Sequence, residues 1–296
     1  MNRKWFQDVQ KHARTYAQGV YSGIMRNIWQ RRAPVLCAMF LIVAFAALLG
    51  AQYKGRVWQR YEHEMQDPVD DPPDALRRGE FSLGRLRYYS PMDRGRGRYA
   101  RWGIDANKGD RLFISLMSRL TRLDAGPIET IVELDSDEIF EHPFTLAISV
   151  GDWEISRPQA ARLRKYFDQG GFLMVDDFHN DREWANFMAG IRQIYPEAEV
   201  DELQASDPIF HTLFDTQKLT RVPGQNVVHG DQIERGGTIP HWRAIRDTKG
   251  HVVVVIGFNM DIGDGWEFAD DPGYPEQYAT EAIRTGLSYA IYALTH

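Results

Sequence analysis

The chain has 296 residues, of which 43% are hydrophobic and 26% are charged, and its formal net charge is −6. A chain of this length and composition can bury a large core. The acidic charge lies after residue 32, which argues against a nucleic-acid-binding protein. The single cysteine, Cys37, lies in an apolar run, so thiol catalysis and disulfides are excluded for the remainder of the chain.

Residues 1–32 are basic and show a helical hydrophobic pattern. Apolar side chains recur at three- to four-residue steps, with lysines and arginines on other faces: Trp5, Val9, Tyr16, Val20, Ile24 and Ile28. We predict a basic amphipathic helix on the cytoplasmic side of a membrane. It either lies on the inner leaflet or docks onto a partner membrane protein, and the first interpretation is favoured.

Residues 33–53 carry no charge and span roughly 30 Å as a helix, which is the thickness of a hydrocarbon core. Basic residues are more frequent before this run than after it, so the N-terminus is predicted to be cytoplasmic. The alternative is a cleaved signal peptide, but the preceding region is long for one. We therefore expect a single-pass protein of a bacterial inner membrane, in contact with the lipid bilayer, with a periplasmic C-terminal domain.

Residues 54–80 contain closely spaced prolines and acidic residues, which disfavour helix and sheet, so they are predicted to be an extracytoplasmic linker. The domain is expected at 81–296. Its turn signals separate strand-like and helix-like segments, with strands at 81–90, 130–135, 144–151, 172–178 and 251–259 and helices at 110–123, 156–169, 181–195 and 276–294. This alternation predicts a mainly parallel sheet with helices on both faces.

The strand at 172–178 ends in polar residues, and ligands of open parallel sheets bind at such ends. Asp176, Asp177 and His179 can bind a divalent metal or act in acid–base catalysis if His211 or His241 converges on them. Alternatively, Asp177 caps the next helix and His179 makes a structural hydrogen bond. The second interpretation is favoured, because consecutive strand residues point to opposite faces.

Two charged segments are further candidates for ligand binding. Arg94, Arg96, Arg98 and Arg101 alternate with glycines and can grip an anion, or they pair with the acidic segment 261–271. That segment contains the candidate metal ligands Asp261 and Asp264, although its spacing differs from a calcium-binding loop and a hydrogen-bonded rim is favoured. No cofactor-binding fingerprint is present, so we expect no cofactor.

Several long strings resemble the family called domain of unknown function 4159, over about 81–296: RLRYYSP, GRYARW, VDDFHNDREW, HWRAI, FNMDIGDGWEFADDPGYP and YAIYALTH. The resemblance implies the class I glutamine amidotransferase-like superfold and its ThuA-like branch, with a flavodoxin-like sheet. True amidotransferases carry a cysteine nucleophile after a strand, whereas the comparable strand end here reads Asp176, Asp177, Phe178 and His179. The resemblance also implies association with envelope proteins.

These observations predict a membrane-anchored extracytoplasmic module that binds an integral membrane or envelope protein partner and is not catalytic. The rival hypothesis is a non-thiol hydrolase of an envelope sugar or amide that uses Asp177, His179 and His211. Convergence of these three side chains in a pocket is the feature that would favour the hydrolase.

Overall fold

The computed structural model describes residues 61–93 and 99–296. The predicted amphipathic helix at 1–32, the predicted transmembrane helix at 33–53 and three candidate anion ligands lie outside these residues: Arg94, Arg96 and Arg98. Within the described part, no helix is both long and apolar enough to cross a membrane. The membrane anchor therefore stays a prediction from the sequence.

The domain is a mixed α/β fold built on one seven-stranded, mostly parallel sheet. The strands lie in the order β2 (Thr130–Glu133), β1 (Leu83–Arg87), β3 (Phe144–Ile148), β4 (Phe172–Phe178), β7 (Val252–Phe258), β6 (His241–Arg246) and β5 (Asp201–Glu202). Neighbouring strands from β2 to β7 are parallel, whereas β6 is antiparallel to both of its neighbours. The predicted parallel sheet is thus confirmed.

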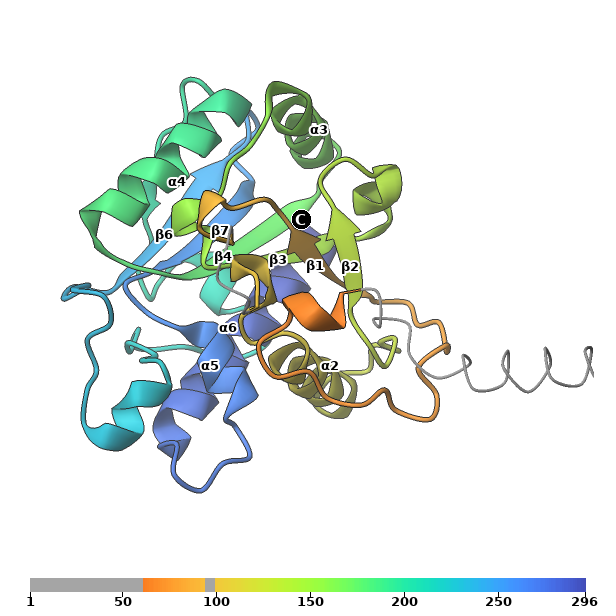
Figure 1. The fold of residues 1–296 in the computed structure, drawn as a ribbon, viewed down its shortest axis with the longest axis vertical. Helices are drawn as coiled ribbons and strands as arrows, with labels where there is room; N and C mark the ends of the chain where they lie inside the picture. Colours follow the sequence, from red (N-terminus) through yellow and green to blue (C-terminus); the bar gives the residue numbers. More distant parts are fainter. Residues whose placement is uncertain (1–60, 94–98) are drawn as a thin grey trace, which may run out of the picture. The chain divides into compact units, whose positions relative to one another are not determined.

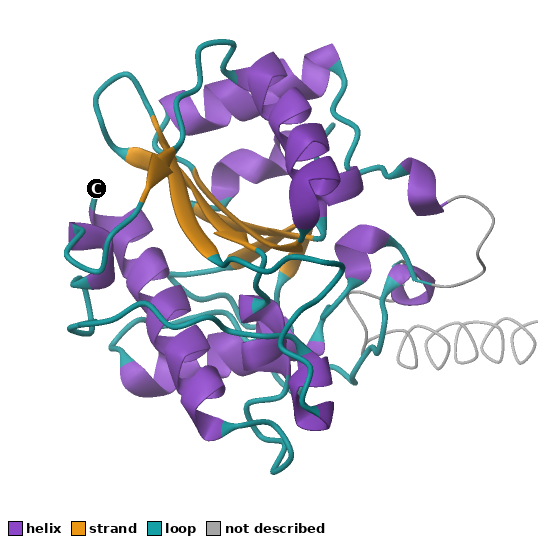
Figure 2. Cartoon of the chain, turned by 90° about the vertical axis from the view of Figure 1, so that its left-hand side faces the viewer, coloured by secondary structure: helices purple, strands orange, loops and turns teal. Residues whose placement is uncertain are grey.

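Helices cover both faces of the sheet, as the alternation of segments predicts (Figures 1 and 2). One apolar core lies under α3 (Arg157–Asp168) and α4 (Asn180–Ile194). The other lies under α2 (Lys108–Leu120), α5 (Ile262–Glu267) and α6 (Glu276–Thr295). Short 3₁₀ helices connect these elements at Glu62–Glu64, Pro91–Asp93, Arg101–Gly103, Asp137–Glu141, Val150–Asp152, Pro208–Phe210 and Gln225–His229.

The start and end of α3 follow from local sequence. The Ser156 side chain accepts a hydrogen bond from Gln159 N, and the Gln159 side chain accepts one from Ser156 N, which makes a capping box. The helix ends at Asp168, and Gly170 follows with a φ of 91°, a left-handed conformation that glycine adopts at little cost. Strand β4 follows at once, and all of its residues are buried because helices cover both of its faces.

Strand β6 is absent from the sequence-based prediction. Its sequence, HWRAIR, alternates polar and apolar residues too weakly to separate a strand from a loop. Its place is decided by β7, whose long buried backbone pairs with it from His241 to Arg246. Tertiary pairing therefore creates this strand.

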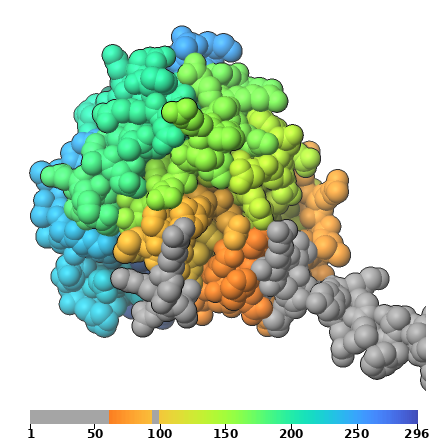
Figure 3. Space-filling model, turned by 45° about the horizontal axis from the view of Figure 1, so that its top comes forward, coloured from red at the N-terminus to blue at the C-terminus, as the bar shows by residue number. Residues whose placement is uncertain are grey.

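Residues 61–80 lie against the domain instead of hanging free as a spacer; they form the orange segment of Figure 3. Met65 is buried, and Gln66 N donates a hydrogen bond to Gly103 O at 2.9 Å. Glu64 accepts two hydrogen bonds from Arg87, both at 2.8 Å. Prolines and like charges disfavour helices and strands in residues 61–80. The segment can still pack against the domain without regular structure, because arginines neutralise its carboxylates. The folded unit thus extends before the expected start at residue 81.

Candidate functional site

Polar residues gather where the parallel strands end, at the edge of the sheet that binds ligands in open α/β folds. Ser149 follows β3, Asp176 and Asp177 close β4, and Asn259 follows β7. Asn259 N donates to Phe178 O at 3.1 Å, which holds the ends of β4 and β7 together. The sequence-based expectation for the position of Asp176 and Asp177 is therefore confirmed.

The backbone at this edge is strained. In the described ranges, six residues other than glycine have a positive φ between 44° and 64°: Asp105, Ser149, Asp177, Asn180, Arg235 and Asn259. Five of them are joined by hydrogen bonds: Ser149 and Arg235 donate to Asp177, and Asn180 N donates to Asn259 Oδ1. Asp105 lies instead beside Asp261 and Asp264. Left-handed backbone at non-glycine residues is costly and concentrates at functional sites, where the surrounding structure holds it in place.

Asp177 is buried and fully engaged. Its Oδ2 accepts a hydrogen bond from Ser149 Oγ at 2.7 Å, and its Oδ1 accepts one from the Arg235 guanidinium at 2.6 Å. His179 Nε2 lies 3.3 Å from the same Oδ1. Burial by itself would raise the pKa of Asp177, but Arg235, His179 and Ser149 together hold that pKa well below its usual range. Asp177 is therefore a carboxylate whose charge Arg235 balances.

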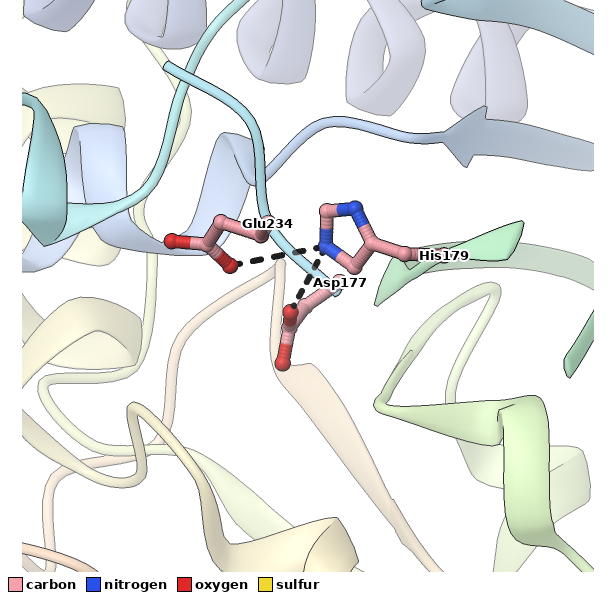
Figure 4. A group of neighbouring side chains, drawn as sticks. All are labelled: Asp177, His179 and Glu234. Atoms are coloured by element: carbon pink, nitrogen blue, oxygen red, sulfur yellow. Dashed lines mark hydrogen bonds and ion pairs between the residues drawn. The ribbon is translucent and has the colours of Figure 1, made fainter. Parts of the chain in front are cut away.

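His179 joins Asp177 to an acid from a distant loop, as Figure 4 shows. Its Nε2 lies 3.5 Å from Glu234 Oε2, and its buried Nδ1 has no hydrogen-bond partner in the described part of the chain. Burial, followed by the charge of Asp177, raises the pKa of Glu234. One ligand atom each from Asp177, His179 and Glu234 lie within 4.8 Å of one another, which is a possible metal-binding geometry.

The expectation that Asp177 caps the next helix is wrong. The side chain of Asn180 caps the helix instead, because its Oδ1 accepts hydrogen bonds from Arg182 N at 3.0 Å and Glu183 N at 3.2 Å. His179 is the N-cap residue, and its own amide donates to Glu183 Oε2 at 2.8 Å. Asp177 is free of this role because the bulge between β4 and β7 turns it toward Ser149.

Asp176 points to other partners than Asp177 does. Its Oδ2 accepts hydrogen bonds from Ile262 N and Gly263 N, in the first turn of α5. Its Oδ1 is buried without a hydrogen-bond partner among the described residues. Burial raises the pKa of Asp176 well above its usual value, even though the two amides oppose this shift. Asp176 thus ties β4 to α5, and the two adjacent aspartates do not share one site.

A second group of carboxylates lies beside α5. One ligand atom each from Asp105, Asp261 and Asp264 lie within 4.8 Å of one another, and all three residues are buried. Asp261 Oδ1 accepts a hydrogen bond from Asp264 N at 2.8 Å, and Asp264 Oδ2 accepts one from Gln225 N at 2.5 Å. Burial, together with nearby negative charge, raises the pKa of Asp264 to about 7 and those of Asp105 and Asp261 well above their usual values.

Three predicted site residues lie apart from these groups. His211 Nδ1 pairs with Asp215 at 2.6 Å, and its Nε2 lies 2.7 Å from Ala205 O. His241 Nδ1 lies 2.9 Å from Glu202 Oε1. Arg101 lies 3.8 Å from Asp152 and has no ion pair to the acidic segment 261–271. Neither histidine converges on Asp177, since both are held by local partners.

Sequence reasoning did not find four residues of this edge: Asp105, Ser149, Glu234 and Arg235. Ser149 had a usable signal, because it lies near the end of the predicted strand 144–151. Glu234 and Arg235 had none, since they lie in an irregular loop that no motif marks. Only folding brings this loop over the end of β4.

A cavity of about 440 Å³ opens beside the ends of β1 and β2. Its lining combines the aromatic side chains of Tyr88, Tyr89 and Trp102 with the charged side chains of Arg87 and Glu133. Tyr89 is 41% exposed, whereas the Tyr88 hydroxyl is fixed by a 2.6 Å hydrogen bond to Ile148 O. Aromatic and charged groups in one recess suit a ligand or a peptide side chain with both polar and apolar parts.

Comparison with known proteins gives a family but no activity. Residues 83–294 match the family model described as a domain of unknown function (DUF4159). No curated protein matches the chain.

Proposed function

Because the chain belongs to the DUF4159 family, whose description names no activity, we propose its function from the site. The domain is a membrane-anchored extracytoplasmic binding module that works in a membrane or envelope complex and is not catalytic. The apolar run at 33–53 and the basic residues before it support the anchor and its orientation.

The observation that carries this proposal is the engagement of Asp177. A nucleophile or general base needs an accessible atom within reach of substrate. Both oxygens of Asp177 accept short hydrogen bonds, from Ser149 and Arg235, and the residue is only 3% exposed. His211, the other expected member of a catalytic group, is held by Asp215. Such a network holds the strand ends in a fixed binding surface.

The strand order supports the finer assignment of the fold. The five parallel strands follow the order β2-β1-β3-β4-β7, which corresponds to the flavodoxin-like order of doubly wound sheets. This order agrees with a glutamine amidotransferase-like fold that lacks its nucleophile. Amidotransfer needs an activated thiolate, and the single cysteine, Cys37, lies far before the domain in the sequence.

The binding role is tested with a photo-crosslinking residue in place of Tyr89, at the mouth of the 440 Å³ cavity. In native membranes this position is expected to yield a discrete adduct with an envelope or membrane protein. The matched control is Leu120, an exposed apolar residue at the end of α2 on another surface. Equal adduct patterns from the two positions, or none from Tyr89, would contradict a partner at the cavity.

One observation favours a second candidate function, a non-thiol hydrolase of an envelope sugar or amide. The pKa of Asp177 is lowered and that of Glu234 is raised, and His179 lies between them. Two acids whose pKa values are pushed apart are typical of a nucleophile or base paired with a proton donor. Glu234 is also the more exposed of the two, with 16% of its side chain accessible.

The two functions are separated by assaying the purified full-length protein on peptidoglycan fragments, glycosides, esters and glutamine, with and without divalent metals. The binding module predicts no turnover above the Asp177→Asn and Glu234→Gln variants. Turnover that both variants abolish, while their unfolding transitions stay intact, would establish the hydrolase instead.

A further inference from the structure

We propose that Asp105, Asp261 and Asp264 form a binding site for a hard divalent cation, Ca²⁺ or Mg²⁺. This site is distinct from the group of Asp177, His179 and Glu234. It lies at the start of α5 and recruits Asp105 from the segment between β1 and α2.

The geometry brings three carboxylates from two distant segments to one point. One oxygen of each lies within 4.8 Å of the others, and the residues are 3%, 3% and 8% exposed. The absence of a side chain at Gly263 leaves room between the carboxylates. A Cβ atom at this position would collide with Asp105 Oδ2 and would lie 3.4 Å from Asp261 Oδ1. Those two oxygens therefore face the same small space beside the Gly263 backbone.

An unpartnered atom points into this space. Asp105 Oδ2 is buried and has no hydrogen-bond partner in the described ranges. Buried polar atoms are rarely left without a partner, and an exception indicates a missing ion or water. Asp261 Oδ1 and Asp264 Oδ2 each accept one backbone hydrogen bond, which leaves both carboxylates with further lone pairs for a cation. The three side chains thus have unused acceptor capacity at one point.

The carboxylates of Asp105, Asp261 and Asp264 differ from the Asp177 group in their charge balance. Asp177 is paired with Arg235 at 2.6 Å, so the Asp177 group already contains a cation. Over residues 61–93 and 99–296, no ion pair joins Asp105, Asp261 or Asp264 to a lysine, arginine or histidine. Three adjacent buried carboxylates repel one another strongly in a medium of low polarity. A divalent cation removes this repulsion and satisfies the unpartnered oxygen.

The donor set defines the class of cation. All three side chains offer carboxylate oxygens, and neither sulfur nor imidazole nitrogen belongs to the group. Oxygen-only sets select Ca²⁺ and Mg²⁺ over zinc and copper, which prefer nitrogen and sulfur. Because the site ties the segment before α2 to the start of α5, its occupation is expected to stabilise the fold.

The test uses the full-length protein in detergent, stripped of metal with a chelator. Titration calorimetry with CaCl₂ and with MgCl₂ measures binding, and thermal unfolding measures its effect on stability. The test variant is Asp105→Asn/Asp261→Asn. Asparagine tolerates the left-handed φ of 59° at position 105 and is a good helix N-cap at position 261, so both substitutions keep the backbone. The control is Asp270→Asn/Asp271→Asn, which removes the same two charges from exposed positions of the same segment.

We expect one of the two salts to bind with about one cation per chain and to raise the unfolding midpoint. The double variant should bind the cation roughly 100-fold or more weakly, which exceeds the loss caused by removing a residue that only orients a metal ligand. The control should bind as the wild type does. Without metal, the double variant should be at least as stable as the wild type, since it removes two repelling charges. Absence of binding by either salt would show that the carboxylates hold protons instead and would overturn the proposal. Undiminished binding by the double variant would also overturn it, because the cation would then bind elsewhere.

Discussion

Arg111, on α2, holds the segment before β1 onto the domain, and its removal tests whether this segment belongs to the folded unit. Its guanidinium lies 2.5 Å from Asp71 Oδ1 and 3.2 Å from Glu129 Oε2, and both carboxylate side chains are 1% exposed. It also donates to the backbone oxygens of Val69 at 3.1 Å and Asp70 at 2.7 Å. One cation thus serves two buried acids and two carbonyls.

The Arg111→Met substitution keeps an unbranched apolar stem and the helix propensity but removes the guanidinium and its charge. Removing one partner of a buried ion pair costs about 3–5 kcal/mol, because the other charge stays buried. Glu129 limits this cost, since its pKa is already raised to about 7 and it can take up a proton near neutral pH. The lost bonds to the two carbonyls add about 1 kcal/mol each. We therefore expect the free energy of unfolding to fall by about 5 kcal/mol, the lower end of this sum, because Glu129 can take up a proton.

The assay is urea unfolding of the full-length protein in detergent, combined with limited proteolysis. The Arg111→Met variant should unfold at lower urea concentration and should be cleaved first within residues 61–80. Arg119→Met is the control, because Arg119 is exposed on the same helix. A loss below about 1 kcal/mol, the usual range for surface substitutions, together with unchanged cleavage, would refute the argument that Arg111 holds this segment.

Three further predictions concern stability. A fragment that starts at Tyr61 should unfold cooperatively and at higher temperature than one that starts at Phe81, because the shorter fragment loses the buried Met65; equal midpoints would contradict this. Gly171→Ala should destabilise by about 1–3 kcal/mol, because a side chain there would collide with the Tyr166 ring, and an unchanged urea midpoint would show that the ring can move. Burial raises the pKa of Glu129 from 4.5 to about 7, so its protonation contributes stability that is complete below pH 4.5 and is lost as pH rises through 7. Glu129→Gln should therefore reduce the fall in unfolding free energy between pH 4.5 and pH 8 by about 3 kcal/mol, and identical pH profiles would contradict the assignment.

Local sequence patterns are sufficient to predict the class of fold and most of its elements. The apolar runs that became β4 and β7 are too long and too continuous for exposed strands, so they indicate a sheet covered on both faces. Ser156 and Gly170 mark the ends of α3 because capping and left-handed termination depend on local backbone geometry alone. The position of Asp176 and Asp177 at a strand end followed from the same local reasoning.

Three features arise only when the chain folds: the pairing of β6, the packing of residues 61–80 and the composition of the site. Each depends on contacts between residues far apart in the chain, which local periodicity does not encode. Asp177 meets Arg235 across 58 positions, and Asp105 meets Asp261 across a greater separation, from residue 105 to residue 261. Such partners are selected by charge balance and by the space that the folded backbone leaves. The sequence therefore leaves the roles of Asp176 and Asp177 open, and the two residues acquire separate partners only in the folded domain.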